Sequence, residues 1–173
     1  HIVHGYNEPF LSLSNQYSRA LQSDGWQVTT VYLTGADDDH IRQKTIADNV
    51  LFFETSDSKM KGLKLGLLLR VRKLVLQHGI TLIIAQRYKS LYLALLGSIG
   101  TKIPVLGIAH AFGVLKSSGR RRLLNLFSSR LTIAGVSEAV TADMRSQIST
   151  PEKNLRLVAL HNCIDTETLE PKL

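Results

Sequence analysis

Three ionisable residues of the sequence stand where a parallel sheet would expose them at one edge. Arg87 and Lys89 follow a short β-branched run at 81–85, and His110 follows a second apolar run at 104–109. If both runs are neighbouring parallel strands, their carboxyl ends meet at the edge where open α/β sheets bind ligands. The sequence therefore predicts that these three side chains share one site.

These side chains offer two kinds of chemistry. A histidine at a strand end can hydrogen-bond a ligand hydroxyl or exchange a proton near neutral pH. An arginine binds phosphate bidentately, and a lysine binds it as a point charge. No acidic residue lies between positions 58 and 137, so no His–carboxylate pair is expected within this stretch. The alternatives are a locally satisfied, packed His110 and a solvated loop carrying Arg87 and Lys89.

The net charge of +7 is unevenly distributed along the chain. Residues 58–137 contain fourteen of the 21 Lys and Arg residues. This asymmetry indicates a polyanionic partner, which can be nucleic acid, an anionic membrane or a phosphorylated substrate. Nucleic acid is disfavoured, because few aromatic residues are interleaved with the basic ones and no binding motif is present. Two basic segments, 59–73 and 116–130, are typical either of helices lying on anionic lipid or of core helices with a solvated face.

Strand-like and helix-like patterns alternate along all 173 residues, of which 44% are hydrophobic and 20% charged. This order predicts one Rossmann-like α/β domain, a doubly wound and mostly parallel sheet with helices on both faces. Ser90 and Ser137 are expected to cap helices. Strands are expected at 2–4, 26–33, 50–54, 81–85, 104–109, 131–136 and 155–160. Helices are expected at 10–23, 62–78, 90–97, 116–130 and 137–148, and the polar segment 34–49 is expected to be a loop with a short helix.

Several classes of site are disfavoured by the composition. The single Cys163 excludes an internal disulfide and favours a reducing compartment. No His, Cys and Asp residues have metal-ligand spacing, so no metal and no cofactor are expected. The loop 5–9 before the first helix has neither dinucleotide nor P-loop glycines, and it can be either a ligand-binding turn or an ordinary βα turn. No apolar run is long enough to cross a bilayer, and the chain begins without a signal-peptide pattern.

The order of several segments resembles one family. QRYKS at 86–90, VLGIAHAFG at 105–113, TIAGVSEAVTADM at 132–144 and HNCID at 161–165 are similar to segments of the amino-terminal, acceptor-binding domain of GT-B retaining glycosyltransferases. The type is glycosyltransferase family 4 (group 1), which includes bacterial lipopolysaccharide-core and mannosyl transferases. Cys163 stands where relatives usually carry glycine.

The resemblance implies that the chain is half of a GT-B fold. Residues 1–165 would form the amino-terminal domain, and residues 166–173 would begin the linker to a carboxyl-terminal domain that binds the nucleotide-sugar. The implied reaction transfers a sugar, with retention, from a nucleotide-diphospho-sugar to an acceptor hydroxyl. The half represented here would be inactive by itself.

Site residues follow from the same resemblance. His110 would contact the donor sugar or act at the reaction centre, and Arg87 and Lys89 would hold an anionic acceptor. The remaining expected positions are Gly5, Tyr6 and Asn7, which would approach the donor phosphates or the acceptor, and Ser137, Glu138 and Asn162, which would line the cleft.

The expected partners are a phosphorylated or lipid-linked acceptor, such as lipopolysaccharide or another cell-envelope glycan, and the chain's own carboxyl-terminal domain. The expected location is the cytoplasm, with peripheral contact to the inner membrane face. The alternative function is a non-catalytic α/β module that binds a small molecule, which would have a self-sufficient ligand pocket.

Overall fold

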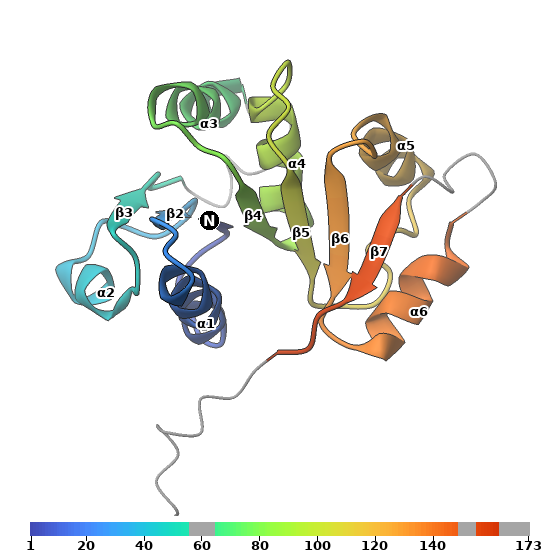
Figure 1. The fold of residues 1–173 in the computed structure, drawn as a ribbon, viewed down its shortest axis with the longest axis horizontal. Coiled ribbons are helices and arrows are strands. Elements are labelled where there is room, and N and C mark those ends of the chain that lie inside the picture. Colours follow the sequence, from blue (N-terminus) through green and yellow to red (C-terminus); the bar gives the residue numbers. More distant parts are fainter. Residues whose placement is uncertain (56–64, 149–154, 163–173) are drawn as a thin grey trace, which may run out of the picture.

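The computed structural model describes residues 1–55, 65–148 and 155–162. Its strands form one seven-stranded sheet in the order β3-β2-β1-β4-β5-β6-β7, and every pairing between these strands is parallel (Figure 1). The predicted Rossmann-like α/β fold is therefore confirmed. The strands are β1 (Ile2–Val3), β2 (Thr29–Tyr32), β3 (Asn49–Phe52), β4 (Ile83–Gln86), β5 (Val105–Ala109), β6 (Leu131–Gly135) and β7 (Arg156–Ala159).

Helices connect the strands in the order that the sequence predicts. The first helix has the predicted bounds, whereas the others are shorter than predicted or begin at a different residue. The predicted domain end at 165 and the linker at 166–173 lie outside the described residues, as do 62–64 of the predicted third helix. The helices are α1 (Phe10–Ser23), α2 (Asp39–Lys44), α3 (Leu65–Gln77), α4 (Arg87–Gly97), α5 (Ser118–Leu126) and α6 (Glu138–Ser146).

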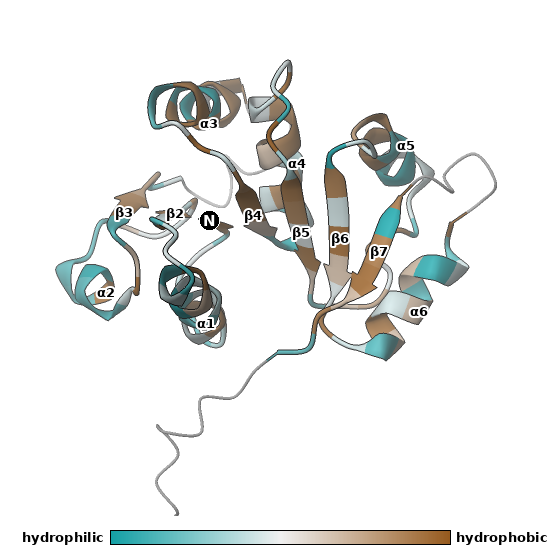
Figure 2. Ribbon diagram, viewed as in Figure 1, coloured by the Kyte–Doolittle hydropathy of each residue, from teal (hydrophilic) through white to brown (hydrophobic). Residues whose placement is uncertain are grey.

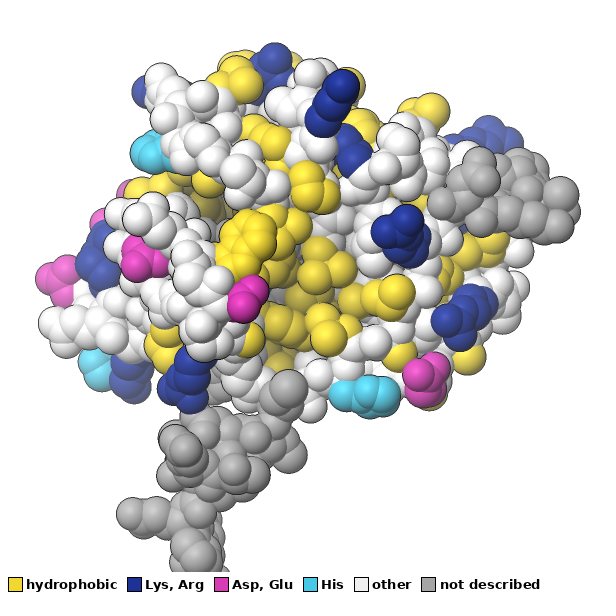
Figure 3. Space-filling model, in the orientation of Figure 1, with side chains coloured by type: hydrophobic (Ala, Val, Ile, Leu, Met, Phe, Trp, Pro, Cys, Tyr) yellow, Lys and Arg dark blue, Asp and Glu magenta, His cyan; other side chains and the backbone are white. Residues whose placement is uncertain are grey.

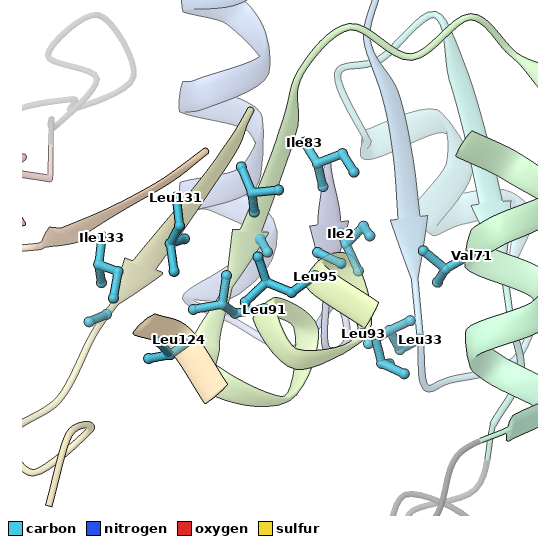
Figure 4. Close-up of a cluster of buried hydrophobic side chains, with 14 of the residues drawn as sticks. Ile2, Leu33, Val71, Ile83, Leu91, Leu93, Leu95, Leu124, Leu131 and Ile133 are labelled. Atoms are coloured by element: carbon cyan, nitrogen blue, oxygen red, sulfur yellow. The ribbon is translucent and has the colours of Figure 1, made fainter. Parts of the chain in front are cut away.

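Two hydrophobic clusters hold the helices against the sheet. The larger cluster joins Ile2, Ile83 and Leu131 of the strands to helices α3, α4, α5 and α6. Figure 4 shows Leu91 and Leu95 of α4 within this cluster, and the central strands β4 and β5 are largely brown, and thus hydrophobic, in Figure 2. Near-continuous apolar strands are typical of a parallel sheet buried by crossover helices.

The smaller cluster lies on the opposite face and seats α1 and α2. It contains Val3, Leu11, Tyr32, Val50 and Phe52. Neighbouring strand residues face opposite sides of a sheet, which is why Ile2 belongs to the larger cluster and Val3 to the smaller one. The amino end of α1 thereby comes to the same side of the sheet as the end of β5.

The two predicted helix caps have different outcomes. Ser137 is the N-cap of α6, and its Oγ accepts a hydrogen bond of 3.2 Å from the backbone N–H of Val140. The prediction for Ser90 is wrong, because α4 begins at Arg87 and Ser90 lies fully buried inside it. Strand β4 extends through the buried Gln86 and passes into the helix without a loop, so the polar residues that suggested a loop are the first turn of a helix.

Candidate functional site

Three side chains from separate elements meet at the carboxyl edge of the sheet. The Arg87 guanidinium lies over the Phe10 ring, with its carbon 5.0 Å from the ring centroid. The Phe10 ring also packs edge-on against the His110 imidazole, and the two ring centroids are 5.7 Å apart. The predicted proximity of Arg87 and His110 is thus present, with the first residue of α1 between them.

His110 is half-buried, and its environment favours the neutral imidazole. Burial lowers the pKa of His110 below its ordinary value, and the nearby positive charge of Arg87 lowers it further. The His110 Nε2 atom is buried, and no described residue supplies a hydrogen-bond partner for it. A buried polar atom without a partner is costly. The imidazole is therefore poised to hydrogen-bond a group that is not part of the described chain.

Two more buried polar atoms near this edge have no hydrogen-bond partner among the described residues: Gln86 Oε1 and Ser90 Oγ. Gln86 pairs with Ile108 in the parallel register, so both side chains lie on one face of the sheet. His110 follows two residues later, at the end of the same strand. Unpaired polar atoms thus accompany both central strands where they end.

The backbone at Arg87 has an unusual conformation. Arg87 has φ +69°, which is in the left-handed region that residues with a Cβ atom rarely adopt. This conformation lets the chain turn from β4 directly into α4, and it places a guanidinium beside Phe10. Strained backbone of this kind is enriched at functional sites, which favours a role for the Arg87 side chain in ligand binding.

This conformation predicts different stabilities for two substitutions. Arg87→Gly and Arg87→Ala both remove the guanidinium, but only glycine has no Cβ atom to oppose a positive φ. We expect the glycine variant to be more stable than the alanine variant by about 1 kcal/mol. Urea unfolding of both variants measures the difference. An alanine variant that is the more stable of the two would contradict the left-handed conformation at this position.

Helices α5 and α6 hold the loop that follows His110. The Asp143 carboxylate of α6 accepts a hydrogen bond of 2.7 Å from the backbone N–H of Gly113, whose φ is +75°. The Arg120 guanidinium of α5 lies 4.3 Å from the ring centroid of Tyr88, the second residue of α4. These contacts fix the β5–α5 loop beside the first turn of α4.

The first loop approaches the site only in part. Asn7 is exposed, and its carbonyl accepts a hydrogen bond from the N–H of Phe10, which starts α1. Tyr6 turns towards β2 and β3, where its ring packs edge-on against Tyr32 and Phe52. Gly5 has little space for a side chain, because a Cβ atom there would come within 2.9 Å of Thr34 Oγ1. Tyr6 therefore packs at the β2–β3 side of this edge, whereas Asn7 is exposed just before the start of α1.

The other predicted residues also follow strand ends. Lys89 is exposed in the first turn of α4, and Ser137 and the exposed Glu138 begin α6 directly after β6. Asn162 is exposed beyond β7. All of them thus belong to the carboxyl edge, but contacts join only Arg87 and His110 of the predicted residues, through Phe10.

Phe10 is the site residue that the sequence patterns missed. Its helical spacing with Leu13 and Tyr17 made it look like an ordinary core position of α1. The available signal was its place directly after the Gly5–Pro9 turn, at a helix terminus that faces the strand ends.

A cavity of about 540 Å³ lies at the other end of the strands. Its lining includes the start of the chain, Trp26 and Val28 before β2, and residues 78–82 before β4. None of the residues discussed at the carboxyl edge lines it. We place the candidate site at the carboxyl edge because the unpartnered His110 Nε2 atom, the basic side chains and the left-handed backbone of Arg87 occur together there. In the described part of the chain, no group of three or more His, Cys, Asp or Glu side chains could hold a metal ion.

Comparison with known proteins gives one family. The model of the family described as Glycosyltransferase Family 4 matches residues 15–168, which is most of the chain. No curated protein and no solved structure matches it.

Proposed function

Because the chain belongs to glycosyltransferase family 4, we propose that it is the acceptor-binding half of a retaining enzyme that transfers a sugar from a nucleotide-diphospho-sugar to an acceptor hydroxyl. The observation that carries this proposal is the buried Nε2 atom of His110, which has no hydrogen-bond partner among the described residues at the ligand-binding edge. A sugar hydroxyl supplies such a partner. The lowered pKa of His110 favours the neutral imidazole, in which one ring nitrogen can accept a hydrogen bond from a sugar hydroxyl.

The basic side chains support an anionic or lipid-linked acceptor, such as a precursor of a cell-envelope glycan. Arg87, Lys89 and Arg120 come from neighbouring elements at this edge, and all three are exposed. An arginine stacked on an aromatic ring is held in place while its N–H groups remain available to phosphate oxygens. We therefore assign Arg87 to the acceptor phosphate, with Lys89 as an additional point charge, while Arg120 adds positive charge beside them and holds the β5–α5 loop.

In this proposal the chain positions the substrates for transfer. The acceptor oxygen forms a bond to the anomeric carbon as the bond to the nucleoside diphosphate breaks, and the proton of the acceptor hydroxyl passes to the departing diphosphate oxygen. Phe10 and His110 would hold the sugar ring at the strand ends, while Asn7, Ser137, Glu138 and Asn162 would line the cleft. The donor phosphates would be held mainly by the carboxyl-terminal domain of the full-length enzyme, and the expected site of action is the cytoplasmic membrane face.

Incubation of the full-length protein with a panel of nucleotide-diphospho-sugars and membrane extract tests this proposal. We expect release of the nucleoside diphosphate from one donor and incorporation of its sugar into the extract. The anomeric configuration of the product, determined by NMR, tests retention. If no donor is consumed although one of them binds saturably, the protein is a small-molecule-binding module and the transferase proposal fails.

A further inference from the structure

The outer side of helix α3 carries an apolar stripe that the fold does not use. The side of α3 that faces the core carries Leu67, Val71 and Val75, which are buried and spaced four residues apart. On the outer side, Leu65, Leu69 and Leu76 are 60%, 66% and 59% exposed. At 100° per residue, these three leucines fall within about 40° of one another on the helix surface. They therefore form one continuous stripe, which we call the outer α3 stripe.

The loop after α4 extends this stripe. The Arg72 guanidinium donates a hydrogen bond of 2.8 Å to the carbonyl of Ile99, which joins the loop to α3. The Ile99 side chain is itself 54% exposed. Figure 3 shows hydrophobic side chains intermixed with Lys and Arg along the molecular edge over α3 and α4. The apolar surface therefore spans two elements that are fixed to each other.

The charged residues of α3 and of the loop after α4 are all basic. Lys73 lies beside the leucines on α3, Lys102 follows Ile99 in the loop, and both are exposed. None of residues 58–137 is acidic, whereas residues 1–57 contain eight acidic and three basic residues. The charge of the molecule is thus polarised, with most of these acidic residues in α2 and in the segments that connect β1, β2 and β3, and the positive charge on the side of α3 and α4.

We propose that the outer α3 stripe, with Ile99, Lys73 and Lys102, docks the protein on an anionic lipid bilayer. Leucines on one side of a helix can enter the acyl boundary, while lysines beside them reach the lipid phosphates. The acidic side of the molecule would then face away from the membrane. In the described part of the chain, no helix is long and apolar enough to cross a membrane, and the proposed contact is peripheral.

The structure favours α3 over α5 as the membrane helix. In α5, Arg120 donates to the carbonyl of Val114 and stacks on Tyr88, and Arg121 donates to the carbonyls of Leu115 and Lys116. These arginines hold the β5–α5 loop. Leu124 of the same helix is fully buried, whereas Leu126 is 79% exposed. Among the large hydrophobic side chains described, Leu126 is the most exposed, and it lies on a different helix from the outer α3 stripe, which makes it a matched control.

Vesicle co-sedimentation of the full chain tests the proposal without any donor or acceptor, so its outcome is independent of the transfer reaction. We expect binding to phosphatidylcholine vesicles that contain phosphatidylglycerol, little binding to phosphatidylcholine alone, and release by high salt. The double variant Leu69→Ser/Leu76→Ser should weaken binding by about tenfold or more, and Lys73→Gln by about fivefold. Leu126→Ser should leave binding unchanged.

Two results would overturn the proposal. If Leu126→Ser weakens vesicle binding and the α3 double variant does not, the membrane surface lies on α5. If the wild-type chain ignores anionic vesicles but forms a dimer that the α3 double variant dissociates, the stripe joins two copies of the chain. Because the substituted leucines are exposed, circular dichroism and thermal unfolding should show unchanged folding in every variant.

Discussion

Replacing His110 by glutamine is expected to lower the rate of sugar transfer by about 100-fold, with the fold intact. Loss of one positioned hydrogen-bonding group at a reaction centre typically costs a factor of this size. His110 is half-buried at the end of β5, and its Nε2 atom has no partner in the described structure, so a bound sugar would lose a hydrogen bond that glutamine cannot reproduce with the same geometry. Steady-state rates of nucleoside diphosphate release measure the effect.

The matched control is His78→Gln. His78 is exposed after α3 and lies near the opposite end of the strands, so its substitution should leave the rate unchanged. Equal rates for wild type and His110→Gln, with unchanged thermal unfolding, would make His110 a packing residue and remove it from the site.

The pH dependence of transfer gives a second test of the same residue. Burial and then the charge of Arg87 lower the pKa of His110 from 6.5. Activity that needs the neutral imidazole should therefore persist below pH 6.5 and fall only as pH drops through the lowered pKa. Arg87→Ala should raise this pKa and move the acidic limb of the rate profile to higher pH, whereas Arg87→Lys should move it less. If the acidic limb of the rate profile stays at the same pH in Arg87→Ala, the charge of Arg87 does not affect the pKa of His110, which would contradict this prediction.

The lowered pKa also affects stability, with a definite sign. An unfolded chain protonates its histidine at a higher pH than the folded chain does, so the unfolded state binds more protons as pH falls below 6.5. The free energy of unfolding should therefore decrease as the pH falls through this range. In the His110→Gln variant this decrease should be smaller, because the contribution of His110 is absent.

Replacing Arg130 by methionine is expected to lower the free energy of unfolding by about 2–3 kcal/mol. The Arg130 guanidinium donates to the carbonyls of Leu95 and Ile103 at 3.0 and 2.9 Å, and to the carbonyl and Oγ of Ser98 at 3.4 and 3.0 Å. It also lies 5.0 Å from the centroid of the Phe127 ring. Methionine fills similar space but removes all four of these hydrogen bonds and the stacking on Phe127.

Arg122→Met is the control for this prediction. Arg122 is exposed on α5, and its loss should change stability by no more than about 0.5 kcal/mol. Urea unfolding measures both variants. If the two variants are equally stable, the hydrogen bonds of Arg130 do not stabilise the fold. Arg130 would then count among the basic residues available to bind an anion.

Arg130 shows that the number of basic residues in the sequence overstates the positive charge that is available to a ligand. The sequence places it among fourteen basic residues that indicate a polyanionic partner. In the structure, burial lowers the pKa of Arg130, and Arg70 likewise donates to the carbonyl of Phe53 and stacks on its ring. Part of the positive charge therefore satisfies backbone carbonyls. Composition records the charge of a side chain but not which oxygen it contacts.

The sequence by itself determined the sheet, the connecting helices and the edge at which the candidate residues lie. These features depend on local patterns, because apolar runs of five or six residues form buried strands and the ends of parallel strands share an edge. His110 at the end of β5 and Ser137 at the start of α6 are where these patterns place them.

Only the tertiary structure decided which side chains meet. Phe10 lies between Arg87 and His110 because α1 packs on the same face of the sheet as the end of β5. The left-handed Arg87 and the buried Ser90 result from a strand that enters a helix without a loop. These contacts depend on residues far apart in the chain, and the periodicity of each segment carries no information about its distant neighbours.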